Sequence, residues 1–142
     1  MVHPFTMGQE PVLFDVDFSG TEQEGYIVST QQATAIPFPI QRVFWSFGVP
    51  ENYVRGNHAH RQDQKVLIAL KGRIVINTET DQEKQFILNS PFQALYVPAL
   101  CWTKLTYAPN SVLLALSSSD FNEADYIRDY PEFKLLRGPL SK

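Results

Sequence analysis

The sequence predicts an all-β protein that folds as a closed antiparallel sandwich or barrel. Short runs of β-branched and aromatic residues recur along the 142-residue chain, and turn-forming residues separate them. No segment before Asn122 shows a convincing helical period. Strands without intervening helices bury their apolar faces by closing on one another. The length suits one domain with a sizeable core and hardly allows two.

The first elements follow from polarity and from the positions of prolines. Residues 1–11 are largely polar or turn-forming, and we expect a flexible arm there, followed by a single domain over residues 12–142. Prolines 37 and 39 lack the amide donor of a central strand, so residues 36–40 are expected to form an extended edge segment. Strands are expected at 12–18, 26–30, 42–47, 55–60, 66–71, 73–77, 85–88, 95–98, 103–107 and 112–117.

The tail, residues 121–133, carries the one helix that we expect. Tyr126, Ile127, Tyr130 and Phe133 supply its large apolar side chains. We expect them to cover the open end of the barrel as a short C-terminal capping helix.

Composition excludes several classes of protein. A formal charge of −3 leaves no basic face for nucleic acid. Cys101 is the only cysteine, so an internal disulfide and a cysteine zinc cluster are both excluded. No segment is apolar enough to span a membrane, and the first residues lack a signal-peptide pattern. We expect a soluble, cytoplasmic protein with neither a nucleic-acid nor a membrane partner.

The motif Arg-Gly-Asn-His-Ala-His at residues 55–60 is the candidate centre of function. Side chains alternate along a strand, so His58 and His60 are expected to face one cavity. Such a pair suits metal ligation or proton transfer, although many His-x-His pairs are only satisfied polar residues at a barrel mouth. Nearby arginines bind phosphate or an enolate oxygen, and aromatic faces stack on sugars and bases. The accompanying residues, which favour proton abstraction next to a carbonyl, are Arg55, Arg42, Tyr96 and Trp102.

The spacing of the histidines between Gly56 and Gly72 resembles the first motif of the cupin superfamily of small β-barrels. Metal-binding cupins add a glutamate to that motif and supply another histidine from a later one. Here the glutamate position falls at Gln64 or Lys65, and residues 98–103 contain no histidine. Two imidazoles alone make a weak site, so we expect no bound metal.

A narrower resemblance covers most of the chain from residue 12 to residue 133. The chain is similar to the WxcM-like sugar 3,4-ketoisomerases, which act on thymidine-diphosphate-linked 4-keto-6-deoxyglucose. His-Ala-His after Arg-Gly, together with Asp-Tyr-Ile-Arg in the tail, is a distinctive combination. The matching segments are 25–27, 36–43, 55–60, 66–72, 95–98, Trp102, 111–114 and 125–130.

The resemblance implies a cupin jelly-roll barrel of the RmlC-like kind and a metal-independent reaction without a cofactor. One histidine removes the C3 proton, and the enediol is reprotonated at C4, which leaves the ketone at C3. In the family two histidines share the proton transfer, and these roles carry over to His58 and His60, with Arg55 stabilising the enediolate. Which of the two takes the C3 proton stays open at this point, and we favour His58. The substrate-binding residues would be Arg42, Phe44, Lys65, Tyr96 and Trp102.

The resemblance also implies a homodimer with an exchanged N-terminal strand, which would suit residues 12–18. The expected partner is a dTDP-linked 4-keto-6-deoxy sugar. A 3-keto product would suit a later aminotransferase, so the implied pathway makes an amino sugar for a surface polysaccharide.

Two departures from the family pattern bear on the site. Phe44 and Trp45 replace tyrosines that are usual in the family, and Phe44 cannot form a hydrogen bond. Lys65 replaces the usual glutamine and places a cation, or an amine of lowered pKa, near the histidines.

Three other functions remain open from the sequence. A sugar-nucleotide epimerase would return the proton to the same carbon and would need a tyrosine acid, for which Tyr96 and Tyr107 are candidates. A non-catalytic cupin would bind the nucleotide-sugar without solvent exchange at C3. A metal-dependent dioxygenase is disfavoured by the missing ligands.

Overall fold

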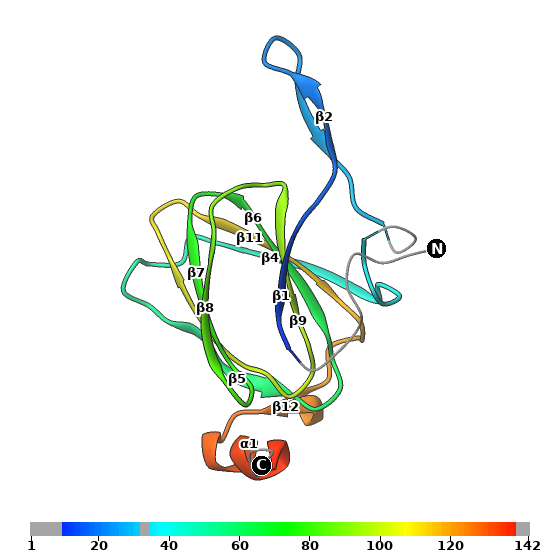
Figure 1. The fold of residues 1–142 in the computed structure, drawn as a ribbon. Coiled ribbons are helices and arrows are strands. Elements are labelled where there is room, and N and C mark those ends of the chain that lie inside the picture. Colours follow the sequence, from blue (N-terminus) through cyan, green and yellow to red (C-terminus); the bar gives the residue numbers. More distant parts are fainter. Residues whose placement is uncertain (1–9, 32–34, 139–142) are drawn as a thin grey trace.

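The computed structural model describes residues 10–31 and 35–138. Its strands are β1 (Val12–Asp15), β2 (Phe18–Thr21), β3 (Gly25–Val28), β4 (Arg42–Phe47), β5 (Arg55–His60), β6 (Lys65–Lys71), β7 (Ile74–Glu79), β8 (Glu83–Leu88), β9 (Gln93–Val97), β10 (Trp102–Tyr107), β11 (Val112–Ser117) and β12 (Tyr126–Ile127). One sheet has the strand order β1-β9-β6-β11-β4, and the second has the order β12-β5-β10-β7-β8. The two sheets form a barrel, and β2 and β3 form a separate hairpin that projects from it (Figure 1). The predicted all-β architecture is confirmed.

The expected strand at residues 12–18 is wrong as one element. Strand β1 pairs with β9 only as far as Asp15 opposite Gln93, where β9 begins. The Val16 amide still donates a hydrogen bond of 2.7 Å to the Phe92 carbonyl oxygen, directly before β9, and Phe18 then pairs with Val28 in the hairpin. The expected strand at residues 26–30 is the second arm of this hairpin.

The proline-containing segment forms turns and bends rather than an extended edge strand. No strand is assigned over residues 35–41, in line with the missing proline donors. Ile36 and Phe38 are nonetheless buried, because they pack on the outer face of the first sheet. The segment therefore serves as a cover for that sheet.

The tail contains more than the expected helix. A 3₁₀ turn at Glu123–Asp125 and the short strand β12 precede helix α1 (Tyr130–Arg137). The helix begins late because Asp129 caps it, accepting a hydrogen bond from the Glu132 amide, and a proline occupies its first turn. Ile127 and Phe133 are fully buried, and they pack with Ala59 and Trp102 in a separate apolar cluster on the outer face of the second sheet. Helix α1 lies below β12 and β5 (Figure 1).

Strand β9 and the first half of β6, in the middle of the first sheet, are buried on both faces. Leu67 and Leu95 point into the barrel, whereas Val66 and Tyr96 point outward into a second apolar layer. This two-sided burial explains why residues 66–69 read as a continuous apolar run rather than as an alternating one.

The expected flexible arm lies outside the described residues as far as residue 9. Its last two residues are held in place: Pro11 is buried, and Glu10 accepts a hydrogen bond of 2.7 Å from the Thr80 hydroxyl. In the described part of the chain, no helix has the length and apolar character to cross a membrane.

Candidate active site in the barrel

A cavity of about 360 Å³ lies between the two sheets. Inward-facing side chains of β4, β5, β6 and β10 form most of its wall. Six of the eight residues predicted for the site line this cavity, and they are Arg42, Phe44, Arg55, His58, His60 and Lys65.

A bulge in β5 aims these residues into the cavity. Gly56 and Asn57 have φ angles of 86° and 60°, and the pairing of β5 with β10 shifts register beside them. Strict alternation would send Arg55 to the face opposite His58, but one extra residue brings both to the same side. A Cβ at position 56 would lie 2.7 Å from the Thr103 carbonyl oxygen, so the bulge needs glycine here.

Hydrogen bonds fix the tautomer of each neutral histidine. The Nδ1 atom of His58 lies 3.0 Å from the Gly56 carbonyl oxygen, and that of His60 lies 3.1 Å from Asp125 Oδ2. Both partners can only accept, so each Nδ1 carries the proton and each Nε2 is left as a base. The Nε2 atom of His60 is buried and forms no hydrogen bond with any described residue.

Burial keeps both imidazoles neutral at physiological pH. It is the largest cause that lowers the pKa of His58 and His60 from 6.5 to about 4. The positive charge of Lys65 adds to the lowering at both sites, and Asp63 and Asp125 oppose it at His60. The pair is therefore ready to accept a proton at pH 7.

Tyr126 completes the histidine cluster, and the sequence argument missed it as a site residue. Its ring centroid lies 4.9 Å from that of His58 and 4.2 Å from that of His60, and it lines the cavity. Strand β12 carries it there by pairing Tyr126 with His60. The neighbouring Asp125 holds His60 and was also missed. The Asp-Tyr-Ile-Arg segment was the available signal, but its contact with β5 spans some 65 residues.

The two arginines of the site have different surroundings. The guanidinium of Arg42 lies over the Phe44 ring, 4.2 Å from its centroid, and 5.2 Å from that of Phe121. The charge of Arg55 acts instead on Tyr107, whose hydroxyl is 2.7 Å from Ser46 Oγ. Arg55 thus lines the same cavity as the histidines.

The structure does not bring Tyr96 and Trp102 to this cavity. Tyr96 lies on the outer face of β9, where its hydroxyl donates a hydrogen bond to Gln64 at 2.7 Å. Trp102 lies on the outer face of β10, packed against Phe133. Alternation explains both positions, because Val97 and Thr103 are the inward-facing neighbours that line the cavity. We therefore leave Tyr96 and Trp102 out of the active-site proposal.

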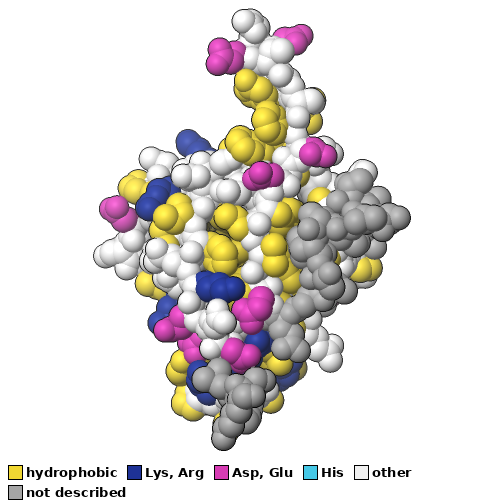
Figure 2. Space-filling model, viewed as in Figure 1, with side chains coloured by type: hydrophobic (Ala, Val, Ile, Leu, Met, Phe, Trp, Pro, Cys, Tyr) yellow, Lys and Arg dark blue, Asp and Glu magenta, His cyan; other side chains and the backbone are white. Residues whose placement is uncertain are grey.

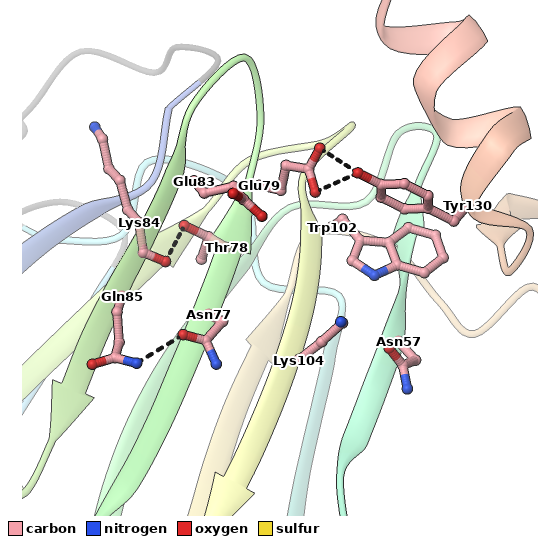
Figure 3. A pocket seen from close by; sticks show the side chains of 10 residues that line it. All are labelled: Asn57, Asn77, Thr78, Glu79, Glu83, Lys84, Gln85, Trp102, Lys104 and Tyr130. Atoms are coloured by element: carbon pink, nitrogen blue, oxygen red, sulfur yellow. Dashed lines mark hydrogen bonds between the residues drawn. The ribbon is translucent and has the colours of Figure 1, made fainter.

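Trp102 instead borders a depression of about 590 Å³ on the outer face of the second sheet (Figure 3). It shares no lining residue with the barrel cavity. The hydroxyl of Tyr130 reaches across from α1 and contacts both carboxylate oxygens of Glu79, at 2.8 and 2.7 Å. The depression contains neither histidine, and the ionisable groups that suit proton transfer lie inside the barrel.

Among the described residues, no group of three or more His, Cys, Asp or Glu side chains is placed to hold a metal ion. In the second ligand segment of the cupin pattern, Cys101 is buried and Thr103 lines the cavity wall. Burial, the largest cause, raises the pKa of the Cys101 thiol to about 12.

Comparison with known proteins gives consistent relatives. The family described as FdtA, WxcM-like, C-terminal, matches residues 13–138. A TDP-4-oxo-6-deoxy-alpha-D-glucose-3,4-oxoisomerase of Aneurinibacillus thermoaerophilus is 33% identical over 115 residues, which cover 80% of this chain and 83% of the relative.

Solved structures agree with the sequence relatives. A 3,4-ketoisomerase from Helicobacter canadensis superposes with a TM-score of 0.86 at 27% identity, covering 93% of this chain and all of that one. A histidine-to-asparagine mutant of the 3,4-ketoisomerase QdtA from Thermoanaerobacterium thermosaccharolyticum, in complex with TDP-4-keto-6-deoxyglucose, has a TM-score of 0.83 at 30% identity, covering 89% and 93% of the two chains. These similarities confirm the expected cupin barrel.

Proposed function

Because the chain belongs to the WxcM-like FdtA family, we propose that it is a sugar-nucleotide 3,4-ketoisomerase whose substrate is dTDP-4-keto-6-deoxyglucose. The relatives that match over most of its length are named for this class of isomerisation. The substrate named in one of their complexes is the 4-keto sugar that we assign here.

One observation carries the proposal. Two neutral imidazoles, each with Nδ1 engaged and Nε2 left as a base, line one cavity. Moving a ketone between adjacent carbons requires proton removal from one carbon and proton delivery to the next. Bases that are neutral at pH 7 suit both steps.

The proposed reaction conserves every proton. Nε2 of His58 takes the C3 proton, the electron pair of that C–H bond forms the C3–C4 double bond, and the C4 oxygen becomes an enediolate oxygen. A proton then returns to C4, the proton of the C3 hydroxyl moves to the C4 oxygen, and the ketone stands at C3. His60 takes part in these proton transfers, because the ring centroids of His58 and His60 are 5.1 Å apart and the two ring planes are nearly perpendicular. The chemistry as proposed uses side chains alone.

The rest of the cavity suits an anionic sugar nucleotide. Arg42 is placed by its aromatic neighbours Phe44 and Phe121, and we assign it to the diphosphate. Phe44 offers a flat apolar face to the sugar in place of a hydrogen-bonding tyrosine. The ketone of the product is the functional group that an aminotransferase consumes, which supports a place in amino-sugar and surface-polysaccharide synthesis.

We further propose that two copies of the chain form a homodimer. The β2–β3 hairpin stands away from the barrel, and hydrophobic side chains run along it (Figure 2). Phe18, Tyr26 and Ile27 are 50%, 56% and 71% exposed there. A lone two-stranded hairpin is marginally stable in water, so a second copy that covers these side chains accounts for its form.

The test follows the sugar by proton NMR in deuterated water. Purified protein with dTDP-4-keto-6-deoxyglucose is expected to give a 3-keto product that carries solvent deuterium at C4, and prior treatment with EDTA should leave the rate unchanged. Exchange at C3 without migration of the ketone would instead indicate an epimerase. Binding without exchange would indicate a non-catalytic sugar-nucleotide protein.

A further inference from the structure

The cavity contains a buried ion pair that the proton-transfer scheme does not use. Lys65 is the first residue of β6, and its side chain is only 12% exposed. Its ammonium Nζ lies 2.8 Å from Asp63 Oδ2, and Asp63 is 4% exposed. Both residues line the same cavity as His58 and His60.

Asp63 is fixed by an unusual number of donors. Its Oδ2 also accepts a 2.6 Å hydrogen bond from the Ser117 hydroxyl. Its Oδ1 accepts three more, from the amide and hydroxyl of Ser118 and from the amide of Ser119, at 3.1, 3.0 and 3.1 Å. A carboxylate held by five donors has little freedom to move, so it is a rigid anchor for the lysine.

The interaction with Asp63 favours the charged form of Lys65, although burial disfavours charged groups. Burial alone would raise the pKa of Asp63, but the charge of Lys65 and the hydrogen bonds outweigh it and hold that pKa at about 2. Burial lowers the pKa of Lys65, and Asp63 opposes that lowering. The pair therefore stabilises an ammonium group beside the histidines.

The proposed reaction requires a positive charge near the C4 oxygen of the sugar. When the C3 proton leaves, negative charge develops on the C4 oxygen of the sugar, and a fixed cation stabilises it. The charge of Arg55 acts on Tyr107, and Arg42 lies over two aromatic rings, whereas the charge of Lys65 acts on both histidines. Lys65 thus lines the same cavity as both histidines and acts on both, whereas Arg128 contributes at His58 but does not line the cavity.

Building on the ketoisomerase function proposed above, we propose that Lys65 is a catalytic residue that stabilises the enediolate oxygen and that Asp63 is the positioning residue that holds it there. Lys65 remains protonated throughout and gives no proton to the sugar. Ser117, Ser118 and Ser119 support this positioning role, because their hydrogen bonds hold the Asp63 carboxylate in place.

The test compares Lys65→Gln, which removes the charge but keeps most of the side chain, with Lys71→Gln, an exposed lysine on the same strand. Three quantities are measured: the histidine pKa values by NMR without substrate, the rate of deuterium exchange into the sugar, and TDP affinity. In Lys65→Gln we expect both histidine pKa values to rise by at least half a pH unit. We also expect exchange at least tenfold slower and TDP affinity unchanged within about twofold. Lys71→Gln should match the wild type in all three.

Asp63→Asn tests the positioning role. This substitution removes the negative charge that faces Lys65, so the ammonium should lose its proton at a lower pH. In the profile of exchange rate against pH, the loss of rate at high pH should therefore begin at least one pH unit lower than in the wild type. If Asp63→Asn does not fold, Ser117→Ala removes one of the five donors and should move this loss of rate in the same direction.

The outcomes separate this inference from the proposed function. Unchanged histidine pKa values in Lys65→Gln, or exchange as fast as in the wild type, would overturn the role of Lys65. A large loss of TDP affinity would make Lys65 a phosphate ligand instead. If the wild type does not exchange protons on the sugar, the ketoisomerase proposal fails, while the histidine titration still decides whether Lys65 sets the charge of the cavity.

Discussion

At the scale of single residues, the two histidines are held by different parts of the chain. The hydrogen-bond partner of His58 is the Gly56 carbonyl in the bulge of its own strand. His60 depends on Asp125, which arrives with the tail and also accepts hydrogen bonds from the Gln62 and Asp63 amides. We therefore assign the C3 proton to His58, the base that is set by the more local structure.

His58→Asn should remove most turnover and leave ligand binding intact. The amide cannot act as the base, and general-base catalysis contributes roughly a hundredfold or more to rate. TDP affinity should stay within about twofold of the wild type, because the base acts in the transition state. The measurement is deuterium exchange at C3 together with a binding isotherm for TDP. Near-normal exchange in this variant would assign the base to another residue.

The histidines also predict how stability depends on pH. The folded-state pKa of His60 is about 4, below its ordinary value of 6.5. Between these values the unfolded chain takes up a proton that the folded chain does not, so the free energy of unfolding falls as the pH falls. With its side chain only 9% exposed, we expect a loss of about 1–2 kcal/mol by pH 5 from His60. Urea unfolding at pH 7.5 and pH 5 measures this loss. His60→Gln should show a smaller difference between the two pH values, and an equal one would contradict the argument.

At the scale of elements, the bulge in β5 decides which side chains share the cavity. Gly56 and Gly48 both have positive φ angles, of 86° and 71°. An added Cβ at Gly48 meets nothing within 4 Å, whereas at Gly56 it would meet the Thr103 carbonyl oxygen at 2.7 Å. Alanine substitutions at the two glycines can therefore be compared: both introduce a side chain at positive φ, but only the one at Gly56 also brings the added Cβ against another strand.

Gly56→Ala should therefore destabilise the protein more than Gly48→Ala. Both carry the cost of a non-glycine residue at positive φ, about 1 kcal/mol. Only Gly56→Ala must also push β10 away from β5, and we expect a further loss of about 1–3 kcal/mol. It should also slow the exchange reaction, since the bulge orients His58. Urea unfolding of the two variants gives the comparison, and equal midpoints would show that β10 yields without cost.

The sequence located the elements well where the signal was local. Strands at 42–47, 55–60 and 112–117 coincide with β4, β5 and β11. The division of residues 12–18 between two strands could not be predicted from those residues alone, because it depends on where their partner strand β9 begins. Tyr96 and Trp102 were assigned to the site by chemical type, although strand alternation places them on outer faces. Asp125 escaped because its partner His60 is 65 residues away, and Asp63 because the serines that hold it are distant in sequence, although its other partner Lys65 is close by.

At the scale of the whole molecule, the exposed apolar surface gathers in two places. One is the projecting hairpin, and the other is the outer face of β4, where Val43, Trp45 and Phe47 are 50%, 62% and 72% exposed. Strand β4 is the last strand of its sheet, so its free edge adds unpaired backbone groups to that surface. Its inner face carries Arg42 and Phe44 into the cavity. We propose that the dimer contact extends from the hairpin to this outer face of β4, so that one strand would serve both the dimer contact and the active site.

Phe47→Glu should convert the dimer to a monomer. The ring is largely exposed in the single chain, so a carboxylate there is solvated in the monomer but would be buried without a partner in the dimer. Leu135→Glu is the matched control, because Leu135 is 83% exposed on α1, outside both apolar surfaces. Light scattering should give twice the 16.2 kDa chain mass for the wild type and for the control, and the single mass for Phe47→Glu. A dimer that survives Phe47→Glu would move the interface away from β4, and a monomeric wild type would refute the dimer.

Because Phe44 and Phe47 belong to one strand, we also expect the monomer to bind TDP more weakly. A monomer with unchanged TDP affinity would show that each barrel holds its ligand independently.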